Sequence, residues 1–164
     1  MSKKNLIVYF SVSNNTKTLA DIIHKNIDSD IVSIDAAKPY SKLFMFRTIR
    51  AKREQSKDKR PAFNELNIKL EEYDTIFIGY PIWWYTLPMI MYSFFDKYDL
   101  SGKTIIPFNT HEGSSDGGTY ETIKKLEPKA KVLEGLPISG GSVKKNNTEK
   151  LVKDWLKKVR WIRS

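Results

Sequence analysis

The chain of 164 residues contains no cysteine. Disulfide bonds, thiolate nucleophiles, iron–sulfur clusters and thiolate zinc sites are therefore excluded. Histidine is nearly absent too, because His24 and His111 are the only two and fall on different predicted elements. We therefore expect no metal site, and no residue has the sequence surroundings of a catalytic acid, base or nucleophile.

Long hydrophobic runs are also missing, so the sequence predicts no membrane-spanning segment. The apolar stretch 5–10 is too short for the core of a signal peptide, and the residues after it are polar and favour a turn. It is typical of a buried strand, and we expect a cytoplasmic protein that does not use a membrane. The length suits one domain, residues 1–164, around one core.

Acidic residues are fewer than basic ones, and the net charge is +9. The excess lies in segments 42–60 and 144–164, each with eight Lys or Arg against two acidic residues, which leaves −3 for the remainder. Two solvated helix faces are the simplest interpretation of these segments. Nucleic acid or an acidic protein partner are the alternatives.

Strand-like and helix-like segments alternate along the whole chain. The predicted strands are 5–10, 30–34, 75–79, 103–108 and 130–133, the last continued at 136–138 after Gly135. The predicted helices are 16–27, 43–55, 89–98, about 119–126, and one that Thr148 caps. Such alternation predicts a parallel sheet with helices on both faces, whose ligands bind beyond the carboxyl ends of the strands.

Segment 11–18, after the first predicted strand, is rich in Ser, Asn and Thr and leads into a helix. Free N–H groups and the positive end of the helix dipole favour an anion there. The segment lacks the glycine pattern of a dinucleotide-binding loop and the glycines and lysine of a Walker motif. Helix capping alone is the alternative interpretation.

Two further loops follow predicted strands at the same rim. Segment 80–88 holds three successive aromatic residues, which are hard to bury on one side of a loop and suit stacking against a flat ring. Segment 109–118 is polar and rich in glycine, which lets backbone groups approach a ligand. A core or dimer-interface cluster and a flexible surface loop are the respective alternatives. Together the three loops suit a planar ring system with a phosphate tail.

The stretches YFSVSNNTKTLA, GYPIWWYTLP and PFNTHEGSSDGG resemble the three FMN-binding loops of the flavodoxin family, and most closely its short bacterial flavodoxin-like branch. The resemblance spans almost the whole chain. It implies an α/β flavodoxin-like three-layer sandwich with a five-stranded parallel sheet of order 2-1-3-4-5 and FMN at the switch point. That order is the known order of flavodoxins and comes from the resemblance alone.

The resemblance also implies which residues bind the cofactor. Those matching the phosphate loop are Ser11, Ser13, Asn14, Asn15 and Thr16. Those matching the loop along the isoalloxazine ring are Pro81, Ile82, Trp83, Trp84 and Tyr85. Those matching the loop at the pyrimidine edge are Thr110, His111, Glu112, Gly113 and Ser114.

The chain departs from the family pattern at three points: Asn14 and Tyr85 stand where glycine is usual, and the net charge is positive. Asn tolerates a left-handed backbone better than most residues, so the first loop can keep its shape. In flavodoxins a peptide of the second loop typically turns over when the flavin gains one electron, and a glycine there accommodates the positive φ. Without that glycine we expect a strained turn and behaviour closer to that of a two-electron carrier.

The function implied is electron transfer through FMN, with a redox protein or a small-molecule electron acceptor as partner. An FMN-dependent NAD(P)H:quinone-type reductase is the alternative within the same fold. A basic nucleic-acid-binding module is the alternative of another class, supported only by the two basic segments. We expect those segments to form two separate positive regions, and we expect no specific nucleic-acid binding.

Overall fold

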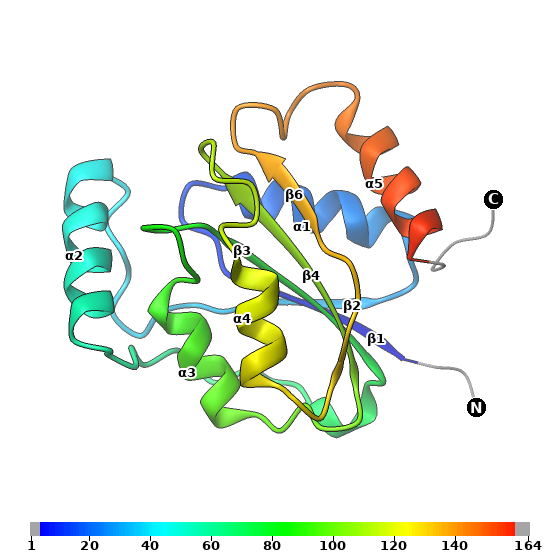
Figure 1. Cartoon of the computed structure of the whole chain (residues 1–164), viewed down its shortest axis with the longest axis horizontal. Helices are drawn as coiled ribbons and strands as arrows, with labels where there is room; N and C mark the ends of the chain where they lie inside the picture. The colour runs from blue at the N-terminus through cyan, green and yellow to red at the C-terminus, as the bar shows by residue number, and fades with distance from the viewer. Residues whose placement is uncertain (1–3, 160–164) are drawn as a thin grey trace.

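The computed structural model describes residues 4–159, in which a parallel sheet lies between helices (Figure 1). The strands are β1 (Asn5–Tyr9), β2 (Asp30–Ser33), β3 (Thr75–Pro81), β4 (Thr104–His111), β5 (Lys131–Val132) and β6 (Leu136–Ser139). The helices are α1 (Asn15–Asn26), α2 (Phe44–Ser56), the short 3-10 helix η1 (Leu70–Glu72), α3 (Met89–Lys97), α4 (Thr119–Leu126) and α5 (Thr148–Lys158). The strand order is β2-β1-β3-β4-β5, and β6 also pairs with β4.

The expected order 2-1-3-4-5 is confirmed, but the sheet has six strands because the last strand of the prediction is split. β5 pairs with the start of β4 and β6 with its end. The interruption falls at Gly135, where a Cβ would lie 2.3 Å from Cζ of Tyr120. The Tyr120 ring therefore occupies the space that a side chain would need, and the strand resumes beyond it.

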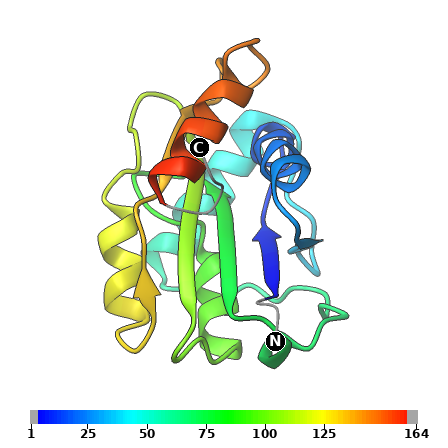
Figure 2. The same ribbon diagram turned by 90° about the vertical axis from the view of Figure 1, so that its right-hand side faces the viewer.

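Two hydrophobic clusters, one on each face of the sheet, form the core. Ile7 and Phe77 face a cluster completed by α1 and α5, whereas Leu6 and Ile76 face one completed by α3 and by the segment that leads into β3. The strands are buried on both faces, which explains their continuous apolar sequences. Figure 2 shows the strands side by side across the view, with α5 crossing in front of the sheet.

β3 and β4 run further than their sequences predict. β3 continues to Pro81 and β4 to His111, and Pro81 pairs with Thr110. The prolines and polar residues at these ends led us to predict loops, but β6 pairs with β4 as far as His111 and keeps it extended. Three residues of the predicted third loop, Asn109, Thr110 and His111, therefore lie on a strand.

The centre of the sheet depends on one close contact between β3 and β4. At Gly79 a Cβ would lie 2.1 Å from Cε2 of Phe108, whose ring covers the glycine. A larger residue at position 79 would have to displace a fully buried aromatic side chain. Glycine at this point is thus a requirement of packing rather than of backbone conformation.

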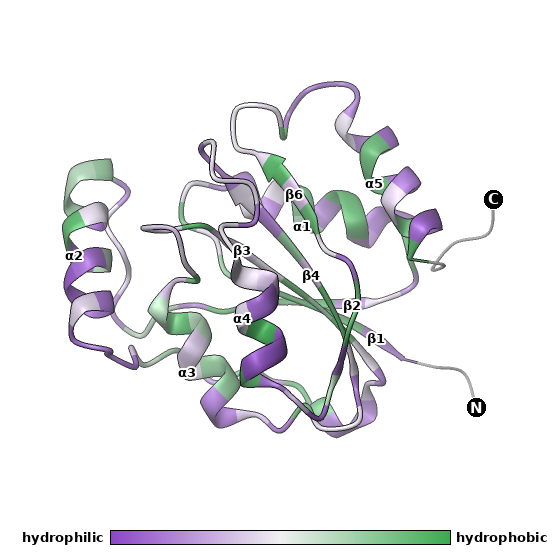
Figure 3. Cartoon of the chain, viewed as in Figure 1, coloured by the Kyte–Doolittle hydropathy of each residue, from purple (hydrophilic) through white to green (hydrophobic). Residues whose placement is uncertain are grey.

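α2 forms where predicted but lies at the outer edge of the molecule, beyond α3 (Figure 1). Its first turns are apolar and its later turns polar (Figure 3), yet Leu43, Phe46 and Ile49 are all exposed. The basic side chains of α2 are exposed or half-buried, as a solvated face requires, and the apolar side chains are exposed beside them. The described part of the second basic segment lies on and before α5, well separated from α2, while Arg160 and Arg163 fall outside the described residues.

The predicted capping role of Thr148 is wrong. Thr148 is the first residue of α5, and its hydroxyl donates to the carbonyl of Ser142 at 2.9 Å instead of closing the helix end. No helix within residues 4–159 has the length and apolar character needed to cross a membrane.

Candidate functional site

The first loop joins β1 to α1 at the carboxyl edge of the sheet. Asn14 adopts a left-handed φ of 69° and its carbonyl accepts the N–H of Thr18 at 2.9 Å. The Ser11 hydroxyl accepts the N–H of Lys17 at 3.2 Å. The first turn of α1 holds no acidic residue, so the positive end of its dipole is not neutralised by the helix itself. The loop can therefore hold an anion.

Thr16, which was also predicted to contact the cofactor, does not line the cavity between the loops. It is buried, and its hydroxyl lies 2.8 Å from that of Thr110 at the end of β4. This pair of hydroxyls joins the first loop to the third across the sheet. Of this loop, Ser13 and Asn15 are the residues that line the cavity.

The second loop contains a tight turn that glycine normally makes. Trp83 and Thr86 exchange N–H···O=C bonds of 3.0 and 3.2 Å, and the residues between them, Trp84 and Tyr85, have φ of 51° and 61°. Two consecutive positive φ angles define a type I′ turn, which favours Asn and Gly. The strained turn expected from the sequence is therefore present.

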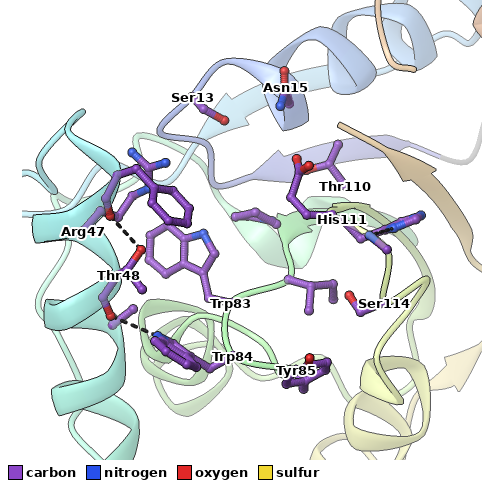
Figure 4. Close-up of a pocket in the computed structure, with 16 residues that line it drawn as sticks. Ser13, Asn15, Arg47, Thr48, Trp83, Trp84, Tyr85, Thr110, His111 and Ser114 are labelled. Carbon is purple, nitrogen blue, oxygen red and sulfur yellow. Dashed lines mark hydrogen bonds between the residues drawn. The ribbon is translucent and has the colours of Figure 1, made fainter. Parts of the chain in front are cut away.

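Helix α2 holds this turn in place (Figure 4). The indole Nε1 of Trp84 donates to the carbonyl of Thr48 at 2.9 Å, and Gln55 Nε2 donates to the carbonyl of Trp84 at 3.4 Å. Lys52 Nζ lies 5.1 Å from the centre of the Trp84 indole. These contacts offset part of the backbone strain, because they need Trp84 in this conformation.

Trp83 is fixed by edge-to-face contacts with two buried rings. Its ring centre lies 5.3 Å from that of Phe10 and 5.1 Å from that of Tyr40. The Tyr40 hydroxyl donates to the carboxylate of Glu54 on α2 at 3.0 Å. Burial, reinforced by this hydrogen bond, raises the pKa of Tyr40 well above its ordinary value. Trp83 therefore presents a rigid aromatic wall to the pocket.

The third loop is held by the buried side-chain amide of Asn109. Asn109 has no exposed surface, and its Nδ2 donates to the carbonyl of Ser115 at 2.9 Å. Its Oδ1 accepts the hydroxyl of Tyr120 at 2.5 Å. Burial raises the pKa of Tyr120, which keeps that hydroxyl protonated and able to donate. Asn109 and Tyr120 were not among the expected site residues, and their role is to position the loop.

His111 turns inward on its own loop. Its Nδ1 accepts the N–H of Gly113 at 3.0 Å, which requires an unprotonated nitrogen there. Gly113 has a φ of 110°, a conformation that only glycine adopts without strain. The contact shapes the loop and gives the imidazole a structural role.

The three loops and α2 enclose a cavity of about 840 Å³ (Figure 4). Of the fifteen predicted residues, twelve line it: Ser13, Asn15, Pro81, Ile82, Trp83, Trp84, Tyr85, Thr110, His111, Glu112, Gly113 and Ser114. Three do not, namely Ser11, Asn14 and Thr16, which shape the first loop from outside. The role of each predicted residue in cofactor binding stays a prediction.

Sequence reasoning missed the wall that α2 contributes. Phe44, Arg47, Thr48 and Ala51 line the cavity although they lie about thirty residues or more from the lining residues of either neighbouring loop. It also missed Gly140, where a Cβ would lie 2.3 Å from Glu112 Oε1 and 2.8 Å from Asn15 Nδ2. Side chains of the first and third loops therefore meet over Gly140. The run of four large apolar residues at 43–46 was the local sign in the sequence that α2 could contribute to a binding cavity.

The cavity suits binding of a flat molecule with an anionic tail. One wall is aromatic, one end is a helix N-terminus, and a loop rich in backbone N–H and C=O groups lies opposite. Within residues 4–159, no three His, Asp or Glu side chains gather in a way that could hold a metal ion. The aromatic wall and the anion-binding end together favour a cofactor that brings its own reactivity.

Comparison with protein families gives one match across the chain. The sequence model of the family described as flavodoxin matches residues 4–159. No curated protein matches the chain.

Solved structures show the same fold. A candidate flavoprotein from Bacteroides eggerthii is 31% identical, with 96% of this chain and 98% of that chain covered and a TM-score of 0.83. A candidate flavoprotein from Bacteroides uniformis is 30% identical over 96% and 99% of the two chains, also with a TM-score of 0.83. A flavoprotein from Lactobacillus acidophilus, solved in complex with FMN, is 22% identical over 88% and 98%, with a TM-score of 0.74.

Proposed function

This chain belongs to the flavodoxin family, and we propose that it binds one FMN at the carboxyl edge of its sheet and transfers electrons through it. One observation carries the proposal: an anion-binding helix end, a fixed aromatic wall and a loop of exposed backbone groups line the same cavity. The similar protein from Lactobacillus acidophilus was solved with FMN, which supports the choice of cofactor.

The residues present fit the parts of FMN. Ser13 and Asn15 can donate to the phosphate together with the N–H groups at the start of α1. Trp83 offers a face for the ring, and segment 111–114 offers backbone groups for its polar edge. FMN, once bound, supplies the redox chemistry, and the protein supplies orientation, electrostatics and shelter from water.

The phosphate contact gives the first test. The Ser13→Ala variant should bind FMN about ten- to a hundredfold more weakly, since a hydrogen bond to a charged group contributes roughly 1.5–3 kcal/mol. Its affinity for riboflavin, which lacks the phosphate, should be unchanged. Affinities follow from quenching of flavin fluorescence during titration of the apoprotein. Ser101→Ala, at the opposite edge of the sheet, serves as the matched control. Equal binding of FMN and riboflavin by the unmodified protein would contradict the proposal.

A reductase that takes hydride from NAD(P)H and reduces a quinone is the second candidate. The observation in its favour is that the cavity extends past the three loops to Phe44 and Arg47 of α2, which leaves room for a second planar molecule. Oxidation of NADPH and NADH by the FMN-loaded protein in the presence of a quinone distinguishes the candidates. A carrier oxidises neither nucleotide at a useful rate, whereas a reductase turns over many times.

A further inference from the structure

The surface around α2 is unusually apolar for an exposed face. Leu43, Phe44, Met45, Phe46 and Ile49 are between 53% and 71% exposed, and Trp84 and Tyr85 of the neighbouring turn are 41% and 77% exposed. We call these seven residues the α2 patch. Among residues 4–159 the only other large exposed hydrophobic side chain is Leu151. Such a concentration at one place marks an interaction site rather than scattered surface residues.

A cofactor in the cavity would leave most of this patch uncovered. Phe44, Trp84 and Tyr85 line the cavity, but Leu43, Met45, Phe46 and Ile49 do not. The patch therefore continues outward from the mouth of the cavity over the first turns of α2. Figure 3 colours these turns as the apolar part of the helix. A molecule seated on it would also lie beside the cavity mouth.

The apolar patch is bordered by positive charge. Arg47, Arg50, Lys52 and Arg53 follow along α2. The only carboxylate of this helix, Glu54, is buried and lies 3.4 Å from Arg50 Nε. The helix thus shows several cations and no exposed carboxylate of its own. A complementary surface has an apolar centre with Asp and Glu at its border.

We propose that the α2 patch is the docking surface for an acidic electron-transfer protein. The proposal rests on the FMN function above, because it is the position of the patch at the cavity mouth that gives the partner an electron to exchange. The Trp84–Tyr85 turn belongs to both the patch and the cavity wall, so a docked partner covers the entrance to the site.

Charge and shape disfavour two other occupants. A second copy of the chain would bring the cations of two α2 helices together, and like charges across an interface oppose association. A helix that lies in a membrane surface carries its apolar stripe along its whole length. Here the large apolar residues stop at Ile49, and Arg50–Ser56 contains no large apolar side chain. A compact centre of this kind suits a protein interface.

Two probe proteins of opposite charge test the proposal with the FMN-loaded protein. A reduced acidic [2Fe–2S] ferredoxin should pass electrons to the protein at a rate that falls steeply with ionic strength. A basic c-type cytochrome should accept electrons from it at a rate that rises with ionic strength. Stopped-flow spectroscopy measures both rates. The proposal would be overturned if each rate changed with ionic strength in the opposite direction, or if the rate with the ferredoxin did not depend on ionic strength.

Variants localise the effect to α2. Arg53→Glu should slow association with the ferredoxin about three- to tenfold, and Phe46→Ser should weaken binding about fivefold or more. The matched controls on α5 are Lys157→Glu and Leu151→Ser, which change the same charge and the same kind of exposed residue. Equal effects of the two sets would show attraction by net charge alone and overturn the assignment to α2.

Further measurements separate failure of docking from failure of the proposed function. Titration of the oxidised ferredoxin into the oxidised protein by calorimetry needs no electron transfer, and dithionite reduction reports a working flavin independently. Loss of binding with normal flavin reduction would overturn only the docking surface, whereas absence of bound flavin would overturn the function. Two further results would assign the patch to another occupant and overturn the proposal: stronger binding to phosphatidylserine vesicles, or a dimer that Phe46→Ser dissociates.

Discussion

Trp84 and Tyr85 show how much a single turn can demand of its residues. Both hold a left-handed φ that L-residues with large side chains rarely adopt. The unusual conformation was expected from the sequence only because glycine is missing where related loops have it. What the sequence could not show is the compensation, because the carbonyl of Thr48 and the amide of Gln55 come from a helix about thirty residues earlier.

A substitution at Tyr85 measures the strain. Tyr85→Gly should have a free energy of unfolding about 1 kcal/mol higher than that of Tyr85→Ala and so unfold at a higher urea concentration. The reason is that the left-handed conformation costs an L-residue roughly 1–2 kcal/mol and glycine nearly nothing. Alanine is the control, since both variants lose the same exposed side chain. An alanine variant as stable as the glycine variant would show that the turn is relaxed. Two-electron behaviour of the bound flavin stays a prediction, which a redox titration of Tyr85→Gly against the parent protein can test.

Individual cavity-lining residues were predictable to the extent that they lie next to a strand end. Ser13 and Asn15 face the cavity as expected because parallel strands bring their carboxyl ends to one rim. Thr16 was predicted from position alone, and the partner that occupies its hydroxyl, Thr110, lies ninety-four residues away. Contacts over such distances along the chain leave no local pattern, so the sequence could not assign these hydroxyls.

Helix α2 was predicted from the sequence, but the exposure of its apolar side chains was not. Its apolar positions at 43, 46 and 49 have the spacing of a buried stripe, and the pattern alone cannot tell a core contact from a face kept free. The structure leaves that stripe exposed and attaches the helix through its polar side chains. Arg50 and Glu54 contact the segment 38–40 before the helix, and Gln55 contacts Trp84 after it.

Arg50 should therefore matter more than its position on a basic helix implies. Its Nη1 donates to the carbonyls of Lys38 at 2.8 Å and Pro39 at 3.0 Å, and its guanidinium stacks 3.8 Å from the centre of the Tyr40 ring. Arg50→Lys keeps the charge but loses the planar fork, so we expect a loss of about 1–2 kcal/mol in the free energy of unfolding.

Arg53→Lys is the matched control for this experiment. Arg53 lies one turn further along α2 and is exposed, so the same exchange should change stability by less than about 0.5 kcal/mol. Chemical unfolding followed by tryptophan fluorescence measures both. If the two variants lose the same stability, the contacts of Arg50 with residues 38–40 do not hold the helix.

At the scale of the whole molecule, most of the architecture could be predicted from the sequence. The alternation of strands and helices predicted the parallel sheet, and the resemblance to flavodoxins supplied the strand order that the structure confirms. The interruption of the last strand at Gly135 was expected from the sequence, but its cause was not, because the Tyr120 ring packs against Gly135 from another element. The sequence indicated which segments form strands and helices, but not which side chains of distant elements come into contact.

Stability at alkaline pH depends on the amino-terminal edge of the sheet. The Tyr73 hydroxyl donates to the Asp30 carboxylate at 2.5 Å, and this bond, with burial, raises the pKa of Tyr73 to about 12. A phenol whose pKa is raised on folding adds stability below the unfolded-state pKa of about 10, and loses it as the pH rises from there to the folded value. Tyr73→Phe should therefore reduce stability at pH 8 and flatten its decline between about pH 10 and 12.

The expected change in slope is at most about 1.4 kcal/mol per pH unit, the limit for one proton. Urea unfolding at a series of pH values measures it. Tyr85→Phe is the control, because Tyr85 is largely exposed and donates no comparable bond. If the free energy of unfolding of Tyr73→Phe fell with pH in parallel with that of the parent protein, the contact with Asp30 would not be the cause of the decline between about pH 10 and 12.

The polarity of the sheet also fixes how the molecule could be attached to an electrode. All strands run in parallel, so the cavity lies at one edge and the turn between α3 and β4 lies at the other (Figure 1). Ser101 is exposed in that turn, and the chain has no thiol of its own. Ser101→Cys would therefore give a single anchoring point for a gold surface, with every tethered molecule presenting its cavity to the solution.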